Sequence, residues 1–114
     1  MVNCRYSKDV YIVELSGDID HCTSEKIKKE IYMNTGKYVR KMIIDLTNVE
    51  FMDSSGIGMI LGRYKEIKER NGEIALTGIK GNMERIFNMS GLYKIINKFD
   101  TIGEALAEWR SCNE

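Results

Sequence analysis

A short polar corner between two apolar stretches contains the residues best suited to chemistry. Asp53-Ser54-Ser55-Gly56 follows the apolar run at residues 49–52 and precedes a stretch in which apolar residues recur at helical spacing. The corner is therefore expected at a helix N-terminus, where unpaired N–H groups and the helix dipole favour negative charge. We predict that one of the two serines is a phosphorylation switch. A plain helix cap is the alternative, because Asp and Ser are both favoured at that position.

The sequence contains no recognisable catalytic set. A serine nucleophile needs a base and an acid that orients the base, but the chain holds one histidine, His21, and no G-x-S-x-G motif. Gly56, Gly58 and Gly62 form G-x-G-x-x-x-G, which is one residue longer than the dinucleotide fingerprint and falls inside the expected helix. We interpret Gly58 and Gly62 as packing residues that let the helix backbone approach a sheet or a partner closely. The sequence therefore predicts a protein that is not an enzyme.

Acidic and thiol groups are present but follow no metal-ligand pattern. Asp18, Asp20 and Asp53 are expected to be loop or capping acids, since no histidine or cysteine spacing supports a metal site. The three cysteines are odd in number and widely spaced, and none of them forms a C-x-x-C pair. This spacing argues against zinc and against a disulfide framework, and it fits a reducing cytoplasm. We expect no metal and no cofactor.

Length and charge are typical of an ordinary globular domain. The 114 residues suffice for one packed core, and we expect residues 1–114 to form one domain. Seventeen basic residues balance seventeen acidic ones, so no net field draws the chain to nucleic acid or to an anionic membrane surface. No apolar run approaches the roughly 18–20 residues of a membrane span, and the first residues lack a signal-peptide core. We therefore expect a cytoplasmic protein that binds neither nucleic acid nor membrane.

Hydrophobic patterning predicts alternating strands and helices from residue 22 onward. Strands are expected at residues 10–15, 42–46, 73–78 and 93–96, with an antiparallel edge strand at 2–6. Helices are expected at residues 22–34, from about 54 to 70, around 83–87, and from 101 onward. The alternation predicts an α/β fold with a mixed sheet of four or five strands backed by about four helices.

Local signals refine this scheme. Thr23 or Ser24 is expected to cap the first helix and Gly36 to end it, with residues 17–21 as a polar loop ahead of it. Methionine packs irregular gaps, so several methionines are expected to fill the core: Met52, Met59, Met83 and Met89.

Four separate motifs occur in order along the chain: Gly17-Asp18-Ile19-Asp20-His21, Phe51-Met52-Asp53-Ser54-Ser55-Gly56, Leu61-Gly62-Arg63-Tyr64 and Phe87-Asn88-Met89-Ser90-Gly91-Leu92. In sequence and spacing they resemble the anti-sigma factor antagonists, the bacterial members of the STAS domain family, and most of all the sporulation branch of that group. The departures are small. Cys22 stands where a second histidine often does, and residues 80–82 replace a helix start that commonly contains proline. Neither departure touches the serine corner.

The resemblance implies a fold, a function and a set of site residues. It implies one STAS domain whose unphosphorylated form binds an anti-sigma factor serine kinase and thereby releases the sporulation sigma factor F. It also implies that the kinase uses ATP to phosphorylate Ser54, which switches binding off, and that a phosphoserine phosphatase restores it. The residues implied in partner binding are Asp20, Asp53, Ser55, Gly56 and Arg63. Arg63 is expected on the exposed side of its helix. The alternative function is a STAS-type scaffold that senses a nucleotide or another small ligand.

Overall fold

The computed structural model describes residues 1–34 and 38–112. Along the chain the elements are β1 (Val2–Ser7), β2 (Val10–Ile19), α1 (His21–Asn34), β3 (Lys41–Met52), α2 (Ser54–Glu69), β4 (Glu73–Thr77), α3 (Gly81–Ser90), the 3₁₀ turn η1 (Leu92–Lys94), β5 (Asn97–Phe99) and α4 (Ile102–Cys112). Gly36, which was predicted to end the first helix, lies outside the described residues.

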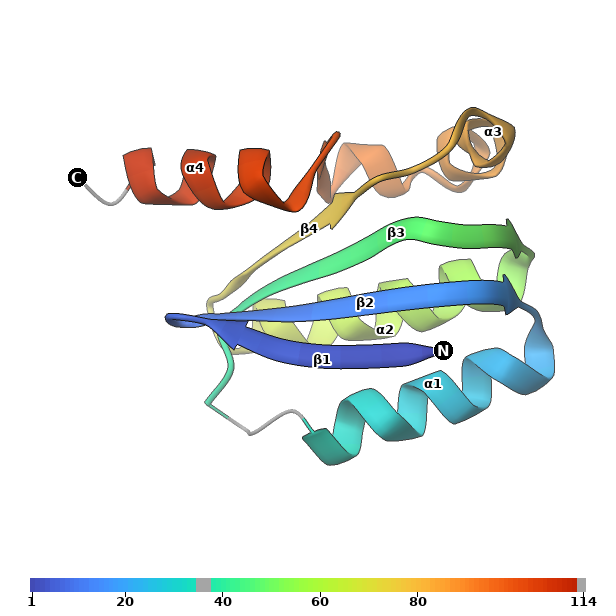
Figure 1. The fold of residues 1–114 in the computed structure, drawn as a ribbon, viewed down its shortest axis with the longest axis horizontal. Helices are drawn as coiled ribbons and strands as arrows, with labels where there is room; N and C mark the ends of the chain where they lie inside the picture. The colour runs from blue at the N-terminus through green and yellow to red at the C-terminus, as the bar shows by residue number, and fades with distance from the viewer. Residues whose placement is uncertain (35–37, 113–114) are drawn as a thin grey trace.

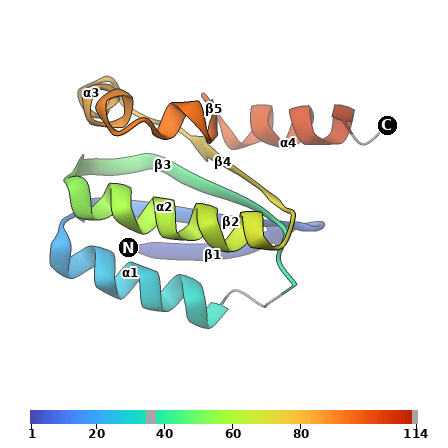
Figure 2. The same ribbon diagram turned by 180° about the vertical axis from the view of Figure 1, so that it is seen from behind.

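The strands form one mixed sheet of five strands in the order β1-β2-β3-β4-β5. β1 is antiparallel to β2, as predicted for the edge strand, and every other neighbouring pair is parallel. α1 and α2 cover one face of the sheet, and α4 lies on the other face (Figures 1 and 2). The predicted α/β class, with a mixed sheet backed by four α-helices, is confirmed.

Alternate residues of the central strands point to opposite faces of the sheet. In β2, Tyr11 and Val13 belong to the larger core beneath α1 and α2, whereas Ile12 faces α4. The smaller core on that second side is completed by Ala105 and Trp109 of α4. A strand covered on both faces needs apolar side chains on both, which explains the nearly continuous apolar runs in the sequence.

The first two parallel strands run further than the sequence predicted. β2 continues to Ile19, through most of the segment predicted as a polar loop, and β3 continues past Leu46 to Met52. Parallel pairing gives the polar backbone of these segments hydrogen-bond partners, at the cost of register shifts at two points. Pairing within the sheet therefore overrides the local loop preference, and the two strands end together at the pair Ile19 and Met52.

The strand predicted at residues 93–96 is wrong. Gly91 ends α3 with a φ of +79°, a conformation that suits glycine. The N–H groups of Ile95 and Ile96 then donate to the carbonyl of Leu92, at 3.0 and 2.8 Å. These local hydrogen bonds close the turn, so Leu92 and Ile96 are buried from a turn while Ile95 is exposed, and β5 forms only after it.

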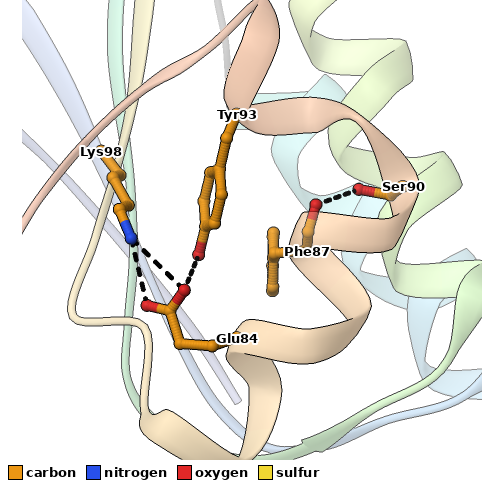
Figure 3. A network of polar contacts seen from close by, with 5 residues as sticks. All are labelled: Glu84, Phe87, Ser90, Tyr93 and Lys98. Atoms are coloured by element: carbon orange, nitrogen blue, oxygen red, sulfur yellow. Dashed lines mark hydrogen bonds and ion pairs between the residues drawn. The ribbon is translucent and has the colours of Figure 1, made fainter.

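A polar network fixes this turn against α3 (Figure 3). The Tyr93 hydroxyl donates to Glu84 Oε2 (2.9 Å), and Lys98 Nζ lies 3.3 Å from the same carboxylate. The Tyr93 ring stacks on Phe87 with centroids 5.9 Å apart, and Ser90 Oγ donates to the Phe87 carbonyl (2.7 Å). Burial, followed by the hydrogen bond to Glu84 and its charge, raises the pKa of Tyr93 well above its usual range.

Tyr93→Phe tests this network, because it removes the hydroxyl and keeps the ring. At neutral pH the variant should lose about 1 kcal/mol of unfolding free energy, the usual net value of one hydrogen bond. A tyrosine with a raised native pKa stabilises the fold below its unfolded pKa of about 10, and this contribution fades as the pH rises further. In urea unfolding, the difference between wild type and variant should therefore narrow from about pH 10 upward. A difference that stays constant there would contradict the raised pKa.

Candidate functional site

The serine corner is a capped N-terminus of α2. Asp53 has an extended backbone (φ −104°, ψ −171°), and its Oδ1 accepts a hydrogen bond from the Ser55 N–H (2.8 Å). The Asp53 carbonyl accepts from the Gly56 N–H (3.1 Å). Ser54 is the first residue of the helix and is exposed, whereas Ser55 is partly buried. The cap therefore comes from Asp53, and it leaves Ser54 at the surface.

α1 begins with a second cap, in which two residues bind each other reciprocally. The Thr23 N–H donates to Asp20 Oδ1 (2.9 Å), and the Asp20 N–H donates to Thr23 Oγ1 (2.8 Å). The prediction that Thr23 or Ser24 caps this helix was wrong, because the strand extends to Ile19 and the helix starts one residue early. The backbone hydrogen bond from Thr23, followed by that from its hydroxyl, lowers the pKa of Asp20 below its usual range.

The sheet brings these two helix starts to one edge. β2 and β3 end side by side at Ile19 and Met52, and the Asp53 N–H donates to the Ile19 carbonyl (3.2 Å). Asp20 and Asp53 therefore follow adjacent strand ends, and Ser54 begins the helix beside them (Figure 1). In open α/β sheets, the carboxyl ends of parallel strands are the usual place for ligand sites.

Gly56 is required by the packing beneath the corner. It is buried, and a Cβ at this position would overlap the Met52 side chain and approach Ile19 Cγ2 to 3.1 Å. Gly58 and Gly62 differ from it, since a Cβ on either residue meets nothing within 4 Å. For the described part of the chain, the predicted close approach of a sheet to these two glycines is therefore wrong.

Alanine substitutions should separate the two kinds of glycine. Gly56→Ala should lower the free energy of unfolding by about 1–3 kcal/mol, the usual cost of overpacking. Gly58→Ala should raise it by about 0.5–1 kcal/mol, because alanine is the better helix residue where space is free. Urea unfolding of both variants measures the difference. A stabilised Gly56→Ala or a destabilised Gly58→Ala would contradict this packing.

Ser54 lines an apolar hollow between the start of α2 and α3, which we call the α2/α3 hollow. Its volume is about 440 Å³, and its lining includes Phe51, Ile57, Ile86 and Met89. Phe51 is 53% exposed and Met89 is 77% exposed. Of the methionines predicted to fill the core, Met89 is the one that does not, because it lies on the outer side of α3 and borders this hollow. This hollow could not be predicted from the sequence, because α2 and α3 are brought together only by the fold.

Arg63 does not lie where it was predicted. It is 4% exposed and therefore buried, not on the exposed side of its helix. Its position three residues after Ile60 and four before Ile67 places it in line with the buried stripe of α2. Nη2 of Arg63 donates to Glu66 Oε1 (3.0 Å). Nε and Nη1 are buried and have no hydrogen-bond partner among the described residues.

A second groove, of about 250 Å³, lies between α1 and α2, and we call it the α1/α2 groove. Arg63 and Ser55 both line it, together with His21 from the first turn of α1. Although Ser54 and Ser55 are neighbours, Ser54 lines the apolar hollow beside α3 and Ser55 lines the groove beside α1. The corner therefore separates two different surfaces.

The remaining candidate groups are dispersed. Asp18 lies in β2, and across residues 1–34 and 38–112 no group of three or more His, Cys, Asp or Glu side chains is placed to hold a metal ion. Cys4 and Cys22 are free thiols. None of the helices in the described part of the chain is long and apolar enough to cross a membrane.

Comparison with known proteins connects this geometry to a family. The sequence pattern of the STAS domain matches residues 2–105. The chain is 37% identical over 108 residues to the anti-sigma F factor antagonist of Paenibacillus polymyxa, a match that covers 94% of this chain and 92% of that protein. The chain belongs to the STAS domain family. The Paenibacillus polymyxa protein, a relative within that family, is an anti-sigma F factor antagonist.

Solved structures show the same fold. The anti-sigma factor antagonist SpoIIAA in its unphosphorylated form superposes with a TM-score of 0.75 at 25% identity, over 96% of this chain and 98% of that one. The Bacillus cell fate determinant SpoIIAA in the phosphorylated form gives a TM-score of 0.72 at 27% identity, over 95% and 98% of the two chains. Both structural similarities extend over nearly the whole chain.

Proposed function

We propose that this chain is an anti-sigma factor antagonist that is switched by phosphorylation of Ser54. Its unphosphorylated form binds an anti-sigma factor serine kinase and thereby releases the sporulation sigma factor F. The observation that supports the proposal most directly is the exposed Ser54 side chain at the capped start of α2. The similarity to SpoIIAA, which has been solved in a phosphorylated form, supports the same chemistry.

Exposure favours Ser54 over Ser55 as the phosphate acceptor. Ser54 is exposed, whereas Ser55 is partly buried and its backbone N–H is bound to Asp53. A kinase has to surround the acceptor hydroxyl with its own catalytic groups, so it reaches the exposed serine with less rearrangement. Local sequence chemistry alone could not make this choice.

Phosphate at Ser54 is compatible with the fold but opposes docking. The group adds about −1.5 to −2 charges, which the N-terminus of α2 tolerates because the helix dipole is positive there. In an interface, however, the phosphate would have to leave water beside the apolar α2/α3 hollow. Burying a charge without a matched partner costs several kcal/mol. A loss of ~3 kcal/mol weakens binding about 100-fold, so a local charge suffices as a switch.

The residues around Ser54 form the proposed docking surface. Asp20 offers a carboxylate that its cap keeps charged, and Asp53 fixes the start of α2. Ser55 and Gly56 shape the corner between the α2/α3 hollow and the α1/α2 groove. Exposed Phe51 supplies apolar area that a partner can cover. Arg63 contributes from within the α1/α2 groove.

The chain is the substrate of the kinase and not itself an enzyme. In this scheme the kinase binds ATP and transfers its γ-phosphoryl group to the Ser54 hydroxyl, which loses its proton, and a separate phosphoserine phosphatase hydrolyses the ester. The kinase, the phosphatase and the sigma factor act in the cytoplasm, and we place this chain there too. The purified chain alone should therefore show no ATP hydrolysis.

Ser54→Asp should weaken binding to the anti-sigma factor kinase while leaving the fold intact. One added carboxylate carries less charge than a phosphate, so we expect a loss of about 10-fold or more in affinity. The midpoint of thermal unfolding should stay within about 4 °C of wild type, because surface substitutions change stability by at most about 0.5 kcal/mol. Calorimetric titration with the kinase gives the affinity, with Ser54→Asn as the uncharged control. Undiminished affinity would contradict the charge mechanism.

Ser54→Ala should act as a permanently active antagonist. When it is added with ATP to a complex of the kinase and sigma factor F, the release of the sigma factor should persist. The wild-type chain should lose this effect as it becomes phosphorylated, and Ser55→Ala should behave like wild type. Fluorescence anisotropy of labelled sigma factor follows the release. A Ser54→Ala chain whose effect decays like that of wild type would contradict the assignment.

A further inference from the structure

A buried arginine with unused hydrogen-bond donors lies in the α1/α2 groove. Arg63 is 4% exposed, and its Nε and Nη1 atoms have no hydrogen-bond partner among the described residues. Nη2 is paired with Glu66 Oε1 at 3.0 Å. The guanidinium is always charged in proteins, and a buried charge without matched acceptors is unfavourable. The unused donors therefore point to an acceptor that the described residues do not provide.

The charge of the groove indicates what that acceptor is. Its basic lining residues are His21, Lys28 and Arg63, and its acidic lining residue is Glu25. His21, Lys28 and Glu25 are exposed, so their charges face the solvent at the opening of the groove. Lys28 and Arg63 are charged at neutral pH and outnumber Glu25 in the lining, while Glu66, which lies outside the lining, pairs with Nη2 of Arg63. An acidic group is complementary to this lining.

Two glycines leave part of one wall of the groove without side chains. Gly58 and Gly62 line it, and a Cβ on either residue would meet nothing within 4 Å. Glycine weakens a helix relative to alanine, so its presence at two positions one turn apart calls for a use of the space. No described side chain fills that space. A group entering from outside the chain would fill it.

We propose that the α1/α2 groove receives an acidic side chain of the anti-sigma factor kinase, whose carboxylate accepts a hydrogen bond from Nε or Nη1 of Arg63. This inference depends on the proposed function and adds a specific contact to it. The groove is continuous with the proposed docking surface, because Ser55 in its lining adjoins Ser54 and His21 adjoins Asp20. A partner docked over the corner therefore lies across the opening of the groove.

Binding requires a side-chain movement. Nε and Nη1 of Arg63 are covered in the isolated chain, so the incoming group has to displace part of the lining. Glu25 is exposed and carries the same charge as an incoming carboxylate, so it is the lining side chain that the carboxylate repels.

Substitutions at two positions test the groove, with the unphosphorylated chain and the cognate kinase in calorimetric titrations. Arg63→Gln, which removes the charge, should weaken binding by about 30-fold or more, as expected when one partner of a buried charge pair is removed. Arg63→Lys should recover part of that loss, since it retains a charged donor. Gly62→Leu, which fills the groove and leaves Arg63 in place, should also weaken binding by about 10-fold or more. Gly103→Leu is the matched control, because Gly103 is exposed in α4, on the other face of the sheet.

The outcomes separate this inference from the proposed function. Wild-type affinity for Gly62→Leu, or for a folded Arg63→Gln, would overturn the inference and leave the proposed function standing, since the wild-type chain still binds the kinase. Equal weakening by Arg63→Gln and Arg63→Lys, with Gly62→Leu unaffected, would assign Arg63 a structural role and also overturn it. If Arg63→Gln does not fold, Gly62→Leu decides. Failure of the wild-type chain to bind the kinase would overturn both proposals.

Discussion

The parallel pairing of β2 with β3 is the constraint on which the rest of the site depends. The two strands stay paired to their last residues, Ile19 and Met52, and the Asp53 N–H extends the pairing by donating to the Ile19 carbonyl at 3.2 Å. Both following helices must therefore start at the same edge of the sheet. Asp20 caps one helix and Asp53 caps the other. If this pairing slipped, the start of α1 would move away from Ser54 and the α1/α2 groove would be lost.

The corner at Ser54 lies between two surfaces of different character. On the α3 side the lining is apolar, with exposed Phe51 and Met89, and a charge placed there loses water when a partner docks. On the α1 side apolar and polar groups together line the groove, and Nε and Nη1 of the buried Arg63 have no partner among the described residues. In the proposed switch, a phosphate on Ser54 would lie beside the apolar surface and oppose docking there. One modification would then change the affinity while the fold is preserved.

The sequence predicted the fold class and the position of the corner, because both depend on local patterns. Apolar periodicity marks α2 from Ile57 to Ile67, and the nearly continuous apolar run at 42–46 marks a strand buried on both faces. Predictions failed at two places, once because of a distant strand and once because of local hydrogen bonds. Parallel pairing drew residues 17–19 into β2, and local hydrogen bonds to Leu92 turned the run at 93–96 into η1.

Parts of the site could not be predicted from the sequence, because helix packing creates them. Arg63 looked like a surface residue, yet its spacing from Ile60 and Ile67 aligns it with the buried stripe, a signal that the sequence already contained. Gly56 and Gly58 look alike in the sequence, and only the close packing of Met52 and Ile19 against Gly56 distinguishes them. Met89 matched the pattern of a core residue but borders the α2/α3 hollow instead.

Ser54, the exposed residue of the corner, is the residue that we propose as regulated. Peptide mapping by mass spectrometry, after incubation of the chain with ATP and the cognate anti-sigma factor kinase, is the decisive measurement. A chain incubated with ATP alone is the control. We expect one phosphate per chain, located on Ser54, and none in the control. Phosphate on Ser55, or no phosphate with an active kinase, would contradict this proposal.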